Sequence, residues 1–216
     1  MLITFEGGEG AGKTTLINRL AEKLSSLGID FIKTREPGGT LLSEHIRLWL
    51  LNRDFDIPVG KKAELLLFLS ARVQHLEELI LPAMKAGKVV LCDRFNDSSV
   101  VYQGLARGLG FEKTEKLCDL VCDGLKPDLT LFLDVEPEIG LGRTQRIKKE
   151  NAEDGEMDRI ESAGVAFHKL VQEGFRRLAL ENSERIYTID ANQSEEDVFQ
   201  DALETTLKKI KQKLPI

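Results

Sequence analysis

The feature that most constrains this chain is a glycine-rich segment, Gly7–Thr14, with the sequence GGEGAGKT. It fits the pattern G-x-x-x-x-G-K-[ST]. A short apolar run, Leu2–Phe5, precedes it, and apolar residues at helical spacing follow it from Leu16 to Leu24. A strand, a glycine-rich turn and a helix in this order are typical of a phosphate-binding loop. The simpler alternative is an ordinary glycine-rich turn between a strand and a helix.

Each residue type in this segment has a physical reason to be there. Glycines let the backbone curl so that its N–H groups point at an anion, and the helix N-terminus adds a partial positive charge. Lys13 can supply a full charge to the β- and γ-phosphates of a nucleotide, and the Thr14 hydroxyl can ligate Mg²⁺. We therefore expect the loop to hold nucleotide phosphates through Gly7, Gly8, Glu9, Gly10, Ala11, Gly12, Lys13 and Thr14.

The rest of the chain alternates strand-like runs with helical stretches of ten residues or more. The runs are apolar nearly throughout, and they cover Ile29–Thr34, Val89–Cys92, Leu129–Asp134 and Ile186–Asp190. This pattern predicts an α/β fold with a parallel sheet that helices cover on both faces. A length of 216 residues fits a single domain, 1–216. Because such folds bind ligands beyond the carboxyl ends of their strands, the residues after each strand are the candidate site.

Composition excludes several classes of function. The net charge of -6 argues against general nucleic-acid binding, and no apolar run approaches the roughly 18 residues of a membrane span. The chain opens on a strand-like run, which leaves no room for a signal peptide. Cys92, Cys118 and Cys122 lack C-x-x-C spacing and have no histidine cluster beside them, so we expect buried free thiols in a reducing cytoplasm.

Charged residues follow the first two strands. A carboxylate such as Glu9 should not face a bound phosphate, so we expect it to point toward a hydroxyl of a second substrate; the alternative is a solvated loop glutamate. The turn Arg35–Thr40 (REPGGT) is structured by its proline and glycines. Arg47 lies beside the apolar face of the next helix and is either a binding group or a surface charge.

The third strand ends at Asp93 and Arg94. Asp93 stands in a Walker-B-like position, where a carboxylate can hold Mg²⁺ through water, and Arg94 can clamp a phosphate. The alternative is a structural ion pair. Ser99, Tyr102 and Gln103 should fall on one side of the following helix, where they offer hydroxyl and amide groups to a ligand.

Residues 61–86 form a long helical pattern that Pro82 is expected to kink. Phe68 and Arg72 are four residues apart, so they share one helix face. An aromatic plane beside a guanidinium can hold a flat heteroaromatic base. In the alternative, Phe68 belongs to the core and Arg72 to the surface.

The fourth strand is followed by a helix that carries Arg143 and Arg146 and then by a polar stretch without apolar anchors. Arginines beside such a stretch predict a lid, at about residues 143–157, that closes over phosphates. The alternative is a solvated charged loop. Asp158–Glu161 is expected to open the next helix.

Taken together, these motifs resemble bacterial thymidylate kinases over nearly the full length. The resemblance is carried by the phosphate loop with Glu9 and by Arg35–Thr40, Asp93–Gly104, Pro127–Asp134 and Asp158–Glu161. It implies a nucleoside-monophosphate-kinase fold with strand order 2-3-1-4-5. It also implies transfer of the ATP γ-phosphoryl to dTMP with Mg²⁺, giving dTDP for dTTP synthesis, by a protein that is usually a homodimer.

The resemblance further implies a role for each candidate residue. Glu9 and Glu36 would lie near the acceptor's sugar, its phosphate and the metal, while Arg47 and Arg94 grip that phosphate. At the base, Phe68 would stack on thymine and Arg72 would bond its edge. The remaining groups are Ser99 and Gln103 facing the base, Tyr102 against the deoxyribose, Thr14 and Asp93 at the metal, and Lys13, Arg94, Arg143 and Arg146 as the catalytic cations. Which of Arg143, Arg146, Lys148 or Lys149 reaches the transferring group stays open.

A phosphate-binding loop is also found in proteins with three other kinds of function. The nearest is a kinase for another nucleotide or nucleoside. A GTPase switch is disfavoured because the chain contains no Asn-Lys-x-Asp and no Asp-x-x-Gly motif. A non-catalytic ATP-binding protein is disfavoured by the joint presence of Lys13, Thr14, Asp93 and Arg94.

Overall fold

The computed structural model describes residues 1–51, 58–150 and 160–214. Within these ranges five parallel strands form one sheet in the order β2-β3-β1-β4-β5, which confirms the predicted fold class and strand order. The strands are β1 (Leu2–Gly7), β2 (Phe31–Arg35), β3 (Val89–Asp93), β4 (Leu129–Asp134) and β5 (Ile186–Asp190).

The inner strands β1, β3 and β4 are buried almost along their whole length, as their apolar runs predict. The outer strands β2 and β5 are partly exposed, as strands at the edges of a sheet commonly are. β2 also begins two residues later than expected, because the backbone N–H of Ile29 bonds back to the Leu24 carbonyl at the end of the preceding helix.

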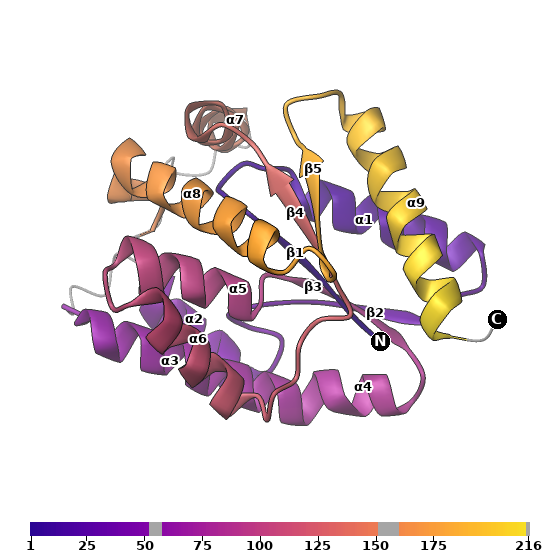
Figure 1. The fold of residues 1–216 in the computed structure, drawn as a ribbon, viewed down its shortest axis with the longest axis horizontal. Coiled ribbons are helices and arrows are strands. Elements are labelled where there is room, and N and C mark those ends of the chain that lie inside the picture. Colours follow the sequence, from indigo (N-terminus) through magenta and orange to yellow (C-terminus); the bar gives the residue numbers. More distant parts are fainter. Residues whose placement is uncertain (52–57, 151–159, 215–216) are drawn as a thin grey trace.

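Helices cover both faces of the sheet (Figure 1). On one face α1 and α9 pack against β1, β3, β4 and β5 around a single apolar core. On the other face the helices from α3 to α6, together with α8, enclose two further cores, and α2 packs on α3 around a smaller one. The helices are α1 (Lys13–Ser26), α2 (Leu41–Leu51), α3 (Lys61–His75), α4 (Leu81–Lys85), α5 (Asn96–Ser99), α6 (Phe111–Val121), α7 (Pro137–Glu150), α8 (Val165–Glu181) and α9 (Glu195–Lys213).

Two helical stretches depart from regular α-helix. The expected helix 61–86 contains a π-helical turn at Leu76–Ile80, which ends two residues before Pro82, whose missing N–H and bulky ring disturb the preceding turn. The helix after β3 changes from α5 into a π-helical segment, Val100–Ala106. The start expected at Asp158–Glu161 lies partly outside the described residues; within them Glu161–Ala163 is a 3₁₀ turn and α8 begins only after Gly164.

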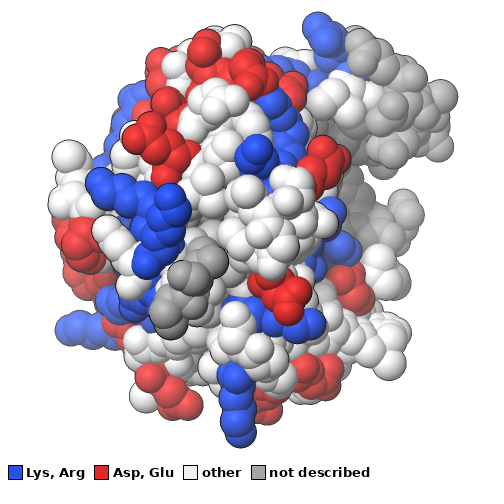
Figure 2. Space-filling view, turned by 90° about the vertical axis from the view of Figure 1, so that its right-hand side faces the viewer, with Lys and Arg blue, Asp and Glu red and all other residues white. Residues whose placement is uncertain are grey.

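The surface mixes both signs of charge. Figure 2 shows acidic and basic side chains interspersed over the face that includes α9, which gives that face no extended basic track for a phosphate backbone. Every helix in the described ranges is too short or too polar to cross a membrane.

Candidate active site

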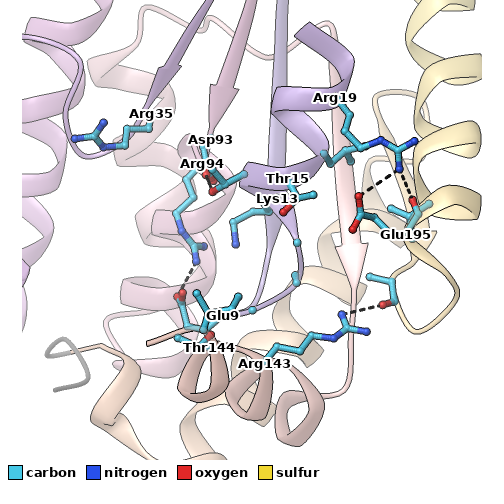
Figure 3. Close-up of a pocket in the computed structure, with 18 of the residues that line it drawn as sticks. Glu9, Lys13, Thr15, Arg19, Arg35, Asp93, Arg94, Arg143, Thr144 and Glu195 are labelled. Carbon is cyan, nitrogen blue, oxygen red and sulfur yellow. Dashed lines mark hydrogen bonds and ion pairs between the residues drawn. The ribbon is translucent and has the colours of Figure 1, made fainter. Parts of the chain in front are cut away.

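The glycine-rich segment joins β1 to α1 at the carboxyl edge of the sheet (Figure 3). Gly12 caps α1 with a left-handed backbone, φ 91°, and Gly10 has φ 66°, which explains why glycine is needed at both. Lys13 Nζ donates to the carbonyl oxygens of Gly8 at 2.9 Å and Gly7 at 3.3 Å. Burial, together with nearby Arg94, lowers the pKa of Lys13.

A cavity of about 850 Å³ opens above this loop. Its walls come from the loop itself, from β3, from α7 and from the segment that leads from β5 into α9. The loop residues from Glu9 to Thr14 line it, as do Asp93, Arg94, Arg143 and Arg146. Gly7 and Gly8 do not face this cavity; instead their carbonyl oxygens accept hydrogen bonds from Lys13.

Helix α7 crosses the loop at very short range. A Cβ atom on Gly140 would lie 2.1 Å from the Glu9 carbonyl oxygen, and one on Gly10 would lie 1.9 Å from the Gly140 carbonyl oxygen. Both distances are below the 3.0 Å that Cβ atoms tolerate. Two glycines therefore allow the helix that carries Arg143 and Arg146 to rest directly on the phosphate loop.

Thr14 and Asp93 meet at the base of this cavity. The Thr14 hydroxyl donates to Asp93 Oδ2 at 3.3 Å. Within the described part of the chain, Asp93 Oδ1 is buried and has no hydrogen-bond partner. A hydroxyl and an unused carboxylate oxygen are hard ligands of the kind that Mg²⁺ prefers, so these two residues fit the metal predicted here.

Arg94 links the phosphate loop to the segment after β3. Its Nη2 donates to Glu9 Oε1 at 2.7 Å, as Figure 3 shows, and its Nη1 donates to the Gly7 carbonyl at 3.1 Å. The Tyr102 hydroxyl also donates to Glu9 Oε1, at 3.1 Å. Although burial alone would raise the pKa of Glu9, Arg94 and Lys13 hold it below its ordinary value, so the loop glutamate stays ionised. Glu9 points toward other protein groups rather than into solvent.

A second cavity, of about 110 Å³, lies between α2, α3 and the helical segment after β3. Every residue predicted to bind the acceptor lines it, namely Glu9, Glu36, Arg47, Phe68, Arg72, Arg94, Ser99, Tyr102 and Gln103. Because Glu9, Glu36, Arg47 and Arg94 also line the larger cavity, the two cavities share a wall of charged side chains.

Arg72 is one of the most deeply buried side chains in the described ranges, at 2% exposure. This excludes the alternative that placed it on the surface. Its Nε donates to Glu36 Oε2 at 2.6 Å, and its Nη2 donates to the Phe95 carbonyl at 3.0 Å. The guanidinium is therefore held in place by groups from two other elements.

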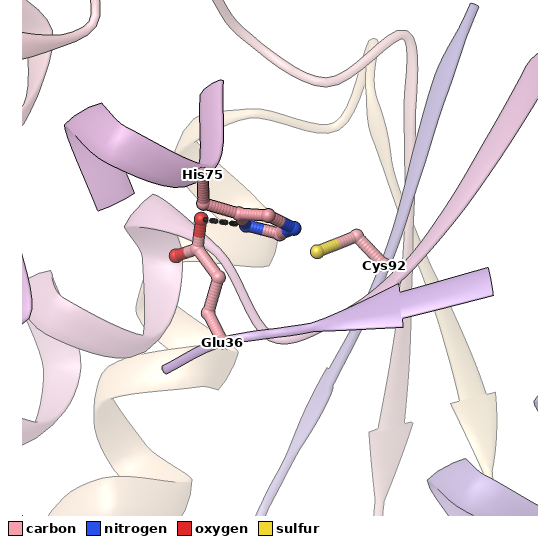
Figure 4. A group of neighbouring side chains, drawn as sticks. All are labelled: Glu36, His75 and Cys92. Atoms are coloured by element: carbon pink, nitrogen blue, oxygen red, sulfur yellow. Dashed lines mark hydrogen bonds and ion pairs between the residues drawn. The ribbon is translucent and has the colours of Figure 1, made fainter. Parts of the chain in front are cut away.

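Glu36 also contacts His75, as Figure 4 shows, and Cys92 lies beside them. The ligand atoms of these three residues lie within 4.8 Å of one another, close enough to suggest a metal. Each is already engaged, however. Glu36 bonds Arg72 and the His75 Nδ1, His75 Nε2 contacts the Thr34 hydroxyl at 2.6 Å, and the Cys92 thiol donates to the Arg94 carbonyl. We therefore interpret the group as structural; all three cysteines are free and buried, as predicted.

The two predicted lid arginines line the larger cavity on its α7 side. Arg143 Nη1 donates to the Ala191 carbonyl at 3.1 Å, which directs it toward the loop after β5 and away from Arg94 (Figure 3). Arg146 is exposed. Residues 151–157 of the predicted lid lie outside the described ranges, and the side chains of Lys148 and Lys149 are not described either.

Two buried carboxylates beside the cavities have no counterpart in the sequence predictions. Glu6, fully buried in β1, accepts from the Phe95 N–H at 2.8 Å and from the Ser98 hydroxyl at 2.6 Å. It thereby fixes the turn in which Arg94 adopts an unusual left-handed φ of 67°. The side chain of Glu64 in α3 accepts a hydrogen bond from Gln103, which lines the smaller cavity.

Comparisons with known proteins identify relatives of this chain. A family model described as thymidylate kinase matches residues 5–202. The chain is 57% identical over 202 residues to the thymidylate kinase of Protochlamydia amoebophila, covering 94% of this chain and 90% of that protein. It is 45% identical over 207 residues to that of Geobacillus thermodenitrificans, covering 96% and 89%. The crystal structure of thymidylate kinase from Ehrlichia chaffeensis is similar with a TM-score of 0.74 at 33% identity, covering 95% of this chain and 98% of that one.

Proposed function

Because the chain belongs to the thymidylate kinase family and phosphorylates dTMP to dTDP, we propose that ATP is its phosphoryl donor and Mg²⁺ its metal. ATP occupies the cavity of about 850 Å³ and dTMP the cavity of about 110 Å³, and the product feeds dTTP synthesis. One observation carries this proposal. The two cavities share Glu9, Glu36, Arg47 and Arg94, so nucleotides in each would meet phosphate to phosphate at that wall.

In the acceptor cavity, Phe68 stacks on thymine while Arg72 bonds its edge, and Ser99 and Gln103 face the base. Tyr102 lies against the deoxyribose, where its bond to Glu9 keeps the ring in place. Two arginines, Arg47 and Arg94, bind the acceptor phosphate. Two carboxylates, Glu9 and Glu36, flank it.

The donor side is built from the phosphate loop and α7. Backbone N–H groups of the loop residues that line this cavity, Glu9–Thr14, and the Lys13 ammonium hold the ATP phosphates, while Gly7 and Gly8 only shape the loop. Thr14 and Asp93 would hold Mg²⁺, which when bound neutralises charge on the β- and γ-phosphates. Arg143 and Arg146 act over ATP, as part of a lid at about 143–157 within a single domain, 1–216.

Catalysis in this site is positioning and charge neutralisation. The attacking atom is a phosphate oxygen, which needs no strong general base. Arg94 stands in the wall between the cavities, so it can contact both the acceptor phosphate and the transferring group. Arg143 lies farther toward the β5 side, which suits a contact with the donor.

An acceptor panel tests the proposal. The purified protein is supplied with ATP and Mg²⁺ and with dTMP, UMP, AMP or thymidine, and ADP release is measured by a coupled assay. We expect strong preference for dTMP, no activity in excess chelator, and a raised Mg²⁺ requirement in Asp93→Asn. Equal rates with UMP or AMP would overturn the assignment of the acceptor, and unchanged Mg²⁺ dependence in Asp93→Asn would overturn the metal site.

We further propose that the protein is a cytoplasmic homodimer. Free buried cysteines suit a reducing compartment. Leu41, Leu48 and Trp49 of α2 are exposed, as is Leu66 of α3, the helix on which α2 packs, and exposed apolar side chains of this kind fit a contact with a second copy of the chain. Light scattering should give a dimer mass for the parental protein and a lower mass for Trp49→Glu. A monomeric parental protein would contradict this.

A further inference from the structure

Glu64 is a buried carboxylate at the edge of the acceptor cavity. It lies in the first turn of α3 and is 2% exposed. Its Oε1 accepts a hydrogen bond from Gln103 Nε2 at 3.0 Å and another from Arg107 Nε at 3.3 Å. Gln103 is also 2% exposed and lines the cavity.

The contact fixes which way the Gln103 amide points. A side-chain amide has a donor end and an acceptor end of nearly equal shape, and only its neighbours decide their order. Beside the Arg107 guanidinium, the Glu64 carboxylate offers acceptors only, so the amide nitrogen of Gln103 must face it. The oxygen of the same amide is then the end left for a ligand in the cavity.

We propose that Glu64 is a positioning residue that turns the Gln103 amide so that its Oε1 meets the base of the acceptor nucleotide, and that it thereby selects pyrimidines with a hydrogen on N3. This deepens the proposed function and rests on it. Thymine and uracil carry an N3–H donor, which pairs with an amide oxygen. Cytosine has an unprotonated N3, so two acceptors would face each other without a hydrogen bond.

The test compares the affinities of three nucleotides by calorimetry. In the parental protein dTMP and dUMP should both bind far more tightly than dCMP. Glu64→Gln keeps the shape but can donate as well as accept, so it permits the Gln103 amide to flip. We expect the dTMP-to-dCMP affinity ratio to shrink about tenfold or more, while the dTMP-to-dUMP ratio stays unchanged because both bases carry N3–H.

Two further variants isolate the effect. Glu112→Gln is the matched control, because Glu112 is an exposed glutamate that pairs with Arg177 at 3.0 Å and does not line the cavity. It should leave the dTMP-to-dCMP and dTMP-to-dUMP affinity ratios unchanged. In a Gln103→Ala background Glu64→Gln should have no additional effect on the dCMP ratio. Glu64→Asp serves as the second variant in case Glu64→Gln does not fold. It keeps the charge but moves the carboxylate back by one methylene, and it should also shrink the dTMP-to-dCMP affinity ratio.

The outcomes are separable from those of the proposed function. A parental protein that does not phosphorylate dTMP refutes the function itself. A protein that does so, but whose dTMP-to-dCMP ratio is unchanged in both Glu64 variants, refutes the role of Glu64. If Glu64→Gln shrinks the dTMP-to-dCMP ratio as much in the Gln103→Ala background as in the parental protein, Glu64 does not act through Gln103. That result overturns the inference as well.

Discussion

The crossing of α7 over the phosphate loop gives a sharp prediction. In Gly140→Ala, the added methyl would lie 2.1 Å from the Glu9 carbonyl oxygen and 3.3 Å from the Val135 side chain. The contact with Glu9 is to backbone, so it is relieved only if the loop and the helix separate. Reaching the 3.0 Å that Cβ atoms tolerate requires a movement of about 0.9 Å. Glu9 is the residue whose side chain holds Arg94 and Tyr102, so the displacement reaches the acceptor side too.

A misplacement of about 1 Å in an active site can lower a rate about 100-fold. We therefore expect kcat/KM of Gly140→Ala, measured with dTMP and ATP by ADP release, to fall by about two orders of magnitude. The loss corresponds to roughly 2.7 kcal/mol of transition-state stabilisation.

Gly142→Ala provides the comparison within the same helix. Apart from its chain neighbours and its own helix backbone, a Cβ atom at Gly142 would have no described atom within 4 Å and would face the larger cavity, so the substitution should raise helix stability without moving the loop. Circular dichroism should show both variants folded, with the higher Tm in Gly142→Ala. If folded Gly140→Ala retained kcat/KM within threefold of the parental value, the close packing would not govern the site.

Three further predictions follow from the same site. Arg94→Ala should lower kcat by about 10³–10⁵, as loss of an arginine finger does, whereas Arg177→Ala on the surface should not; a near-parental rate would refute the role of Arg94. Phe68→Ala should raise KM for dTMP about 5–150-fold with little change in kcat, because base stacking contributes about 1–3 kcal/mol; an unchanged KM would place the base elsewhere. Burial, aided by Asp97, raises the pKa of Glu6 to about 8, so its protonated form stabilises the folded state. That stabilisation is complete below pH 4.5 and is lost as the pH rises through about 8. The free energy of unfolding should therefore fall by a few kcal/mol between pH 5 and pH 9 in the parental protein but not in Glu6→Gln, and parallel curves for the two would contradict this.

The sequence predicted those parts of the site that depend on local patterns. The phosphate loop, the Asp93–Arg94 pair and the shared face of Phe68 and Arg72 each depend on a few neighbouring residues. The strand order follows from the family resemblance, and the structure confirms it. The roles of the individual side chains are still predictions.

What the sequence could not predict depends on partners far apart in the chain. Glu6 and Ser98 are separated by 92 residues, and Glu64 and Gln103 by 39. The burial of Arg72 likewise depends on Glu36 and on the Phe95 carbonyl. Two features of the sequence do point toward these contacts: a glutamate directly after an apolar run, and a glycine inside a helical pattern at position 140.

The burial of Arg72 among protein hydrogen-bond partners has a consequence for ligand binding. Its guanidinium is already held in a fixed orientation, so a base bound there as proposed would restrict few additional rotamers and lose little conformational entropy. If ATP binds as proposed, the Lys13 ammonium would exchange its two backbone carbonyl partners for phosphate oxygens. The part of the cavity proposed for the base is therefore pre-formed, and the conformational change on binding should be confined to the groups around the phosphates. Rigid analogues of the base that lack a phosphate should then bind with little rearrangement of the protein.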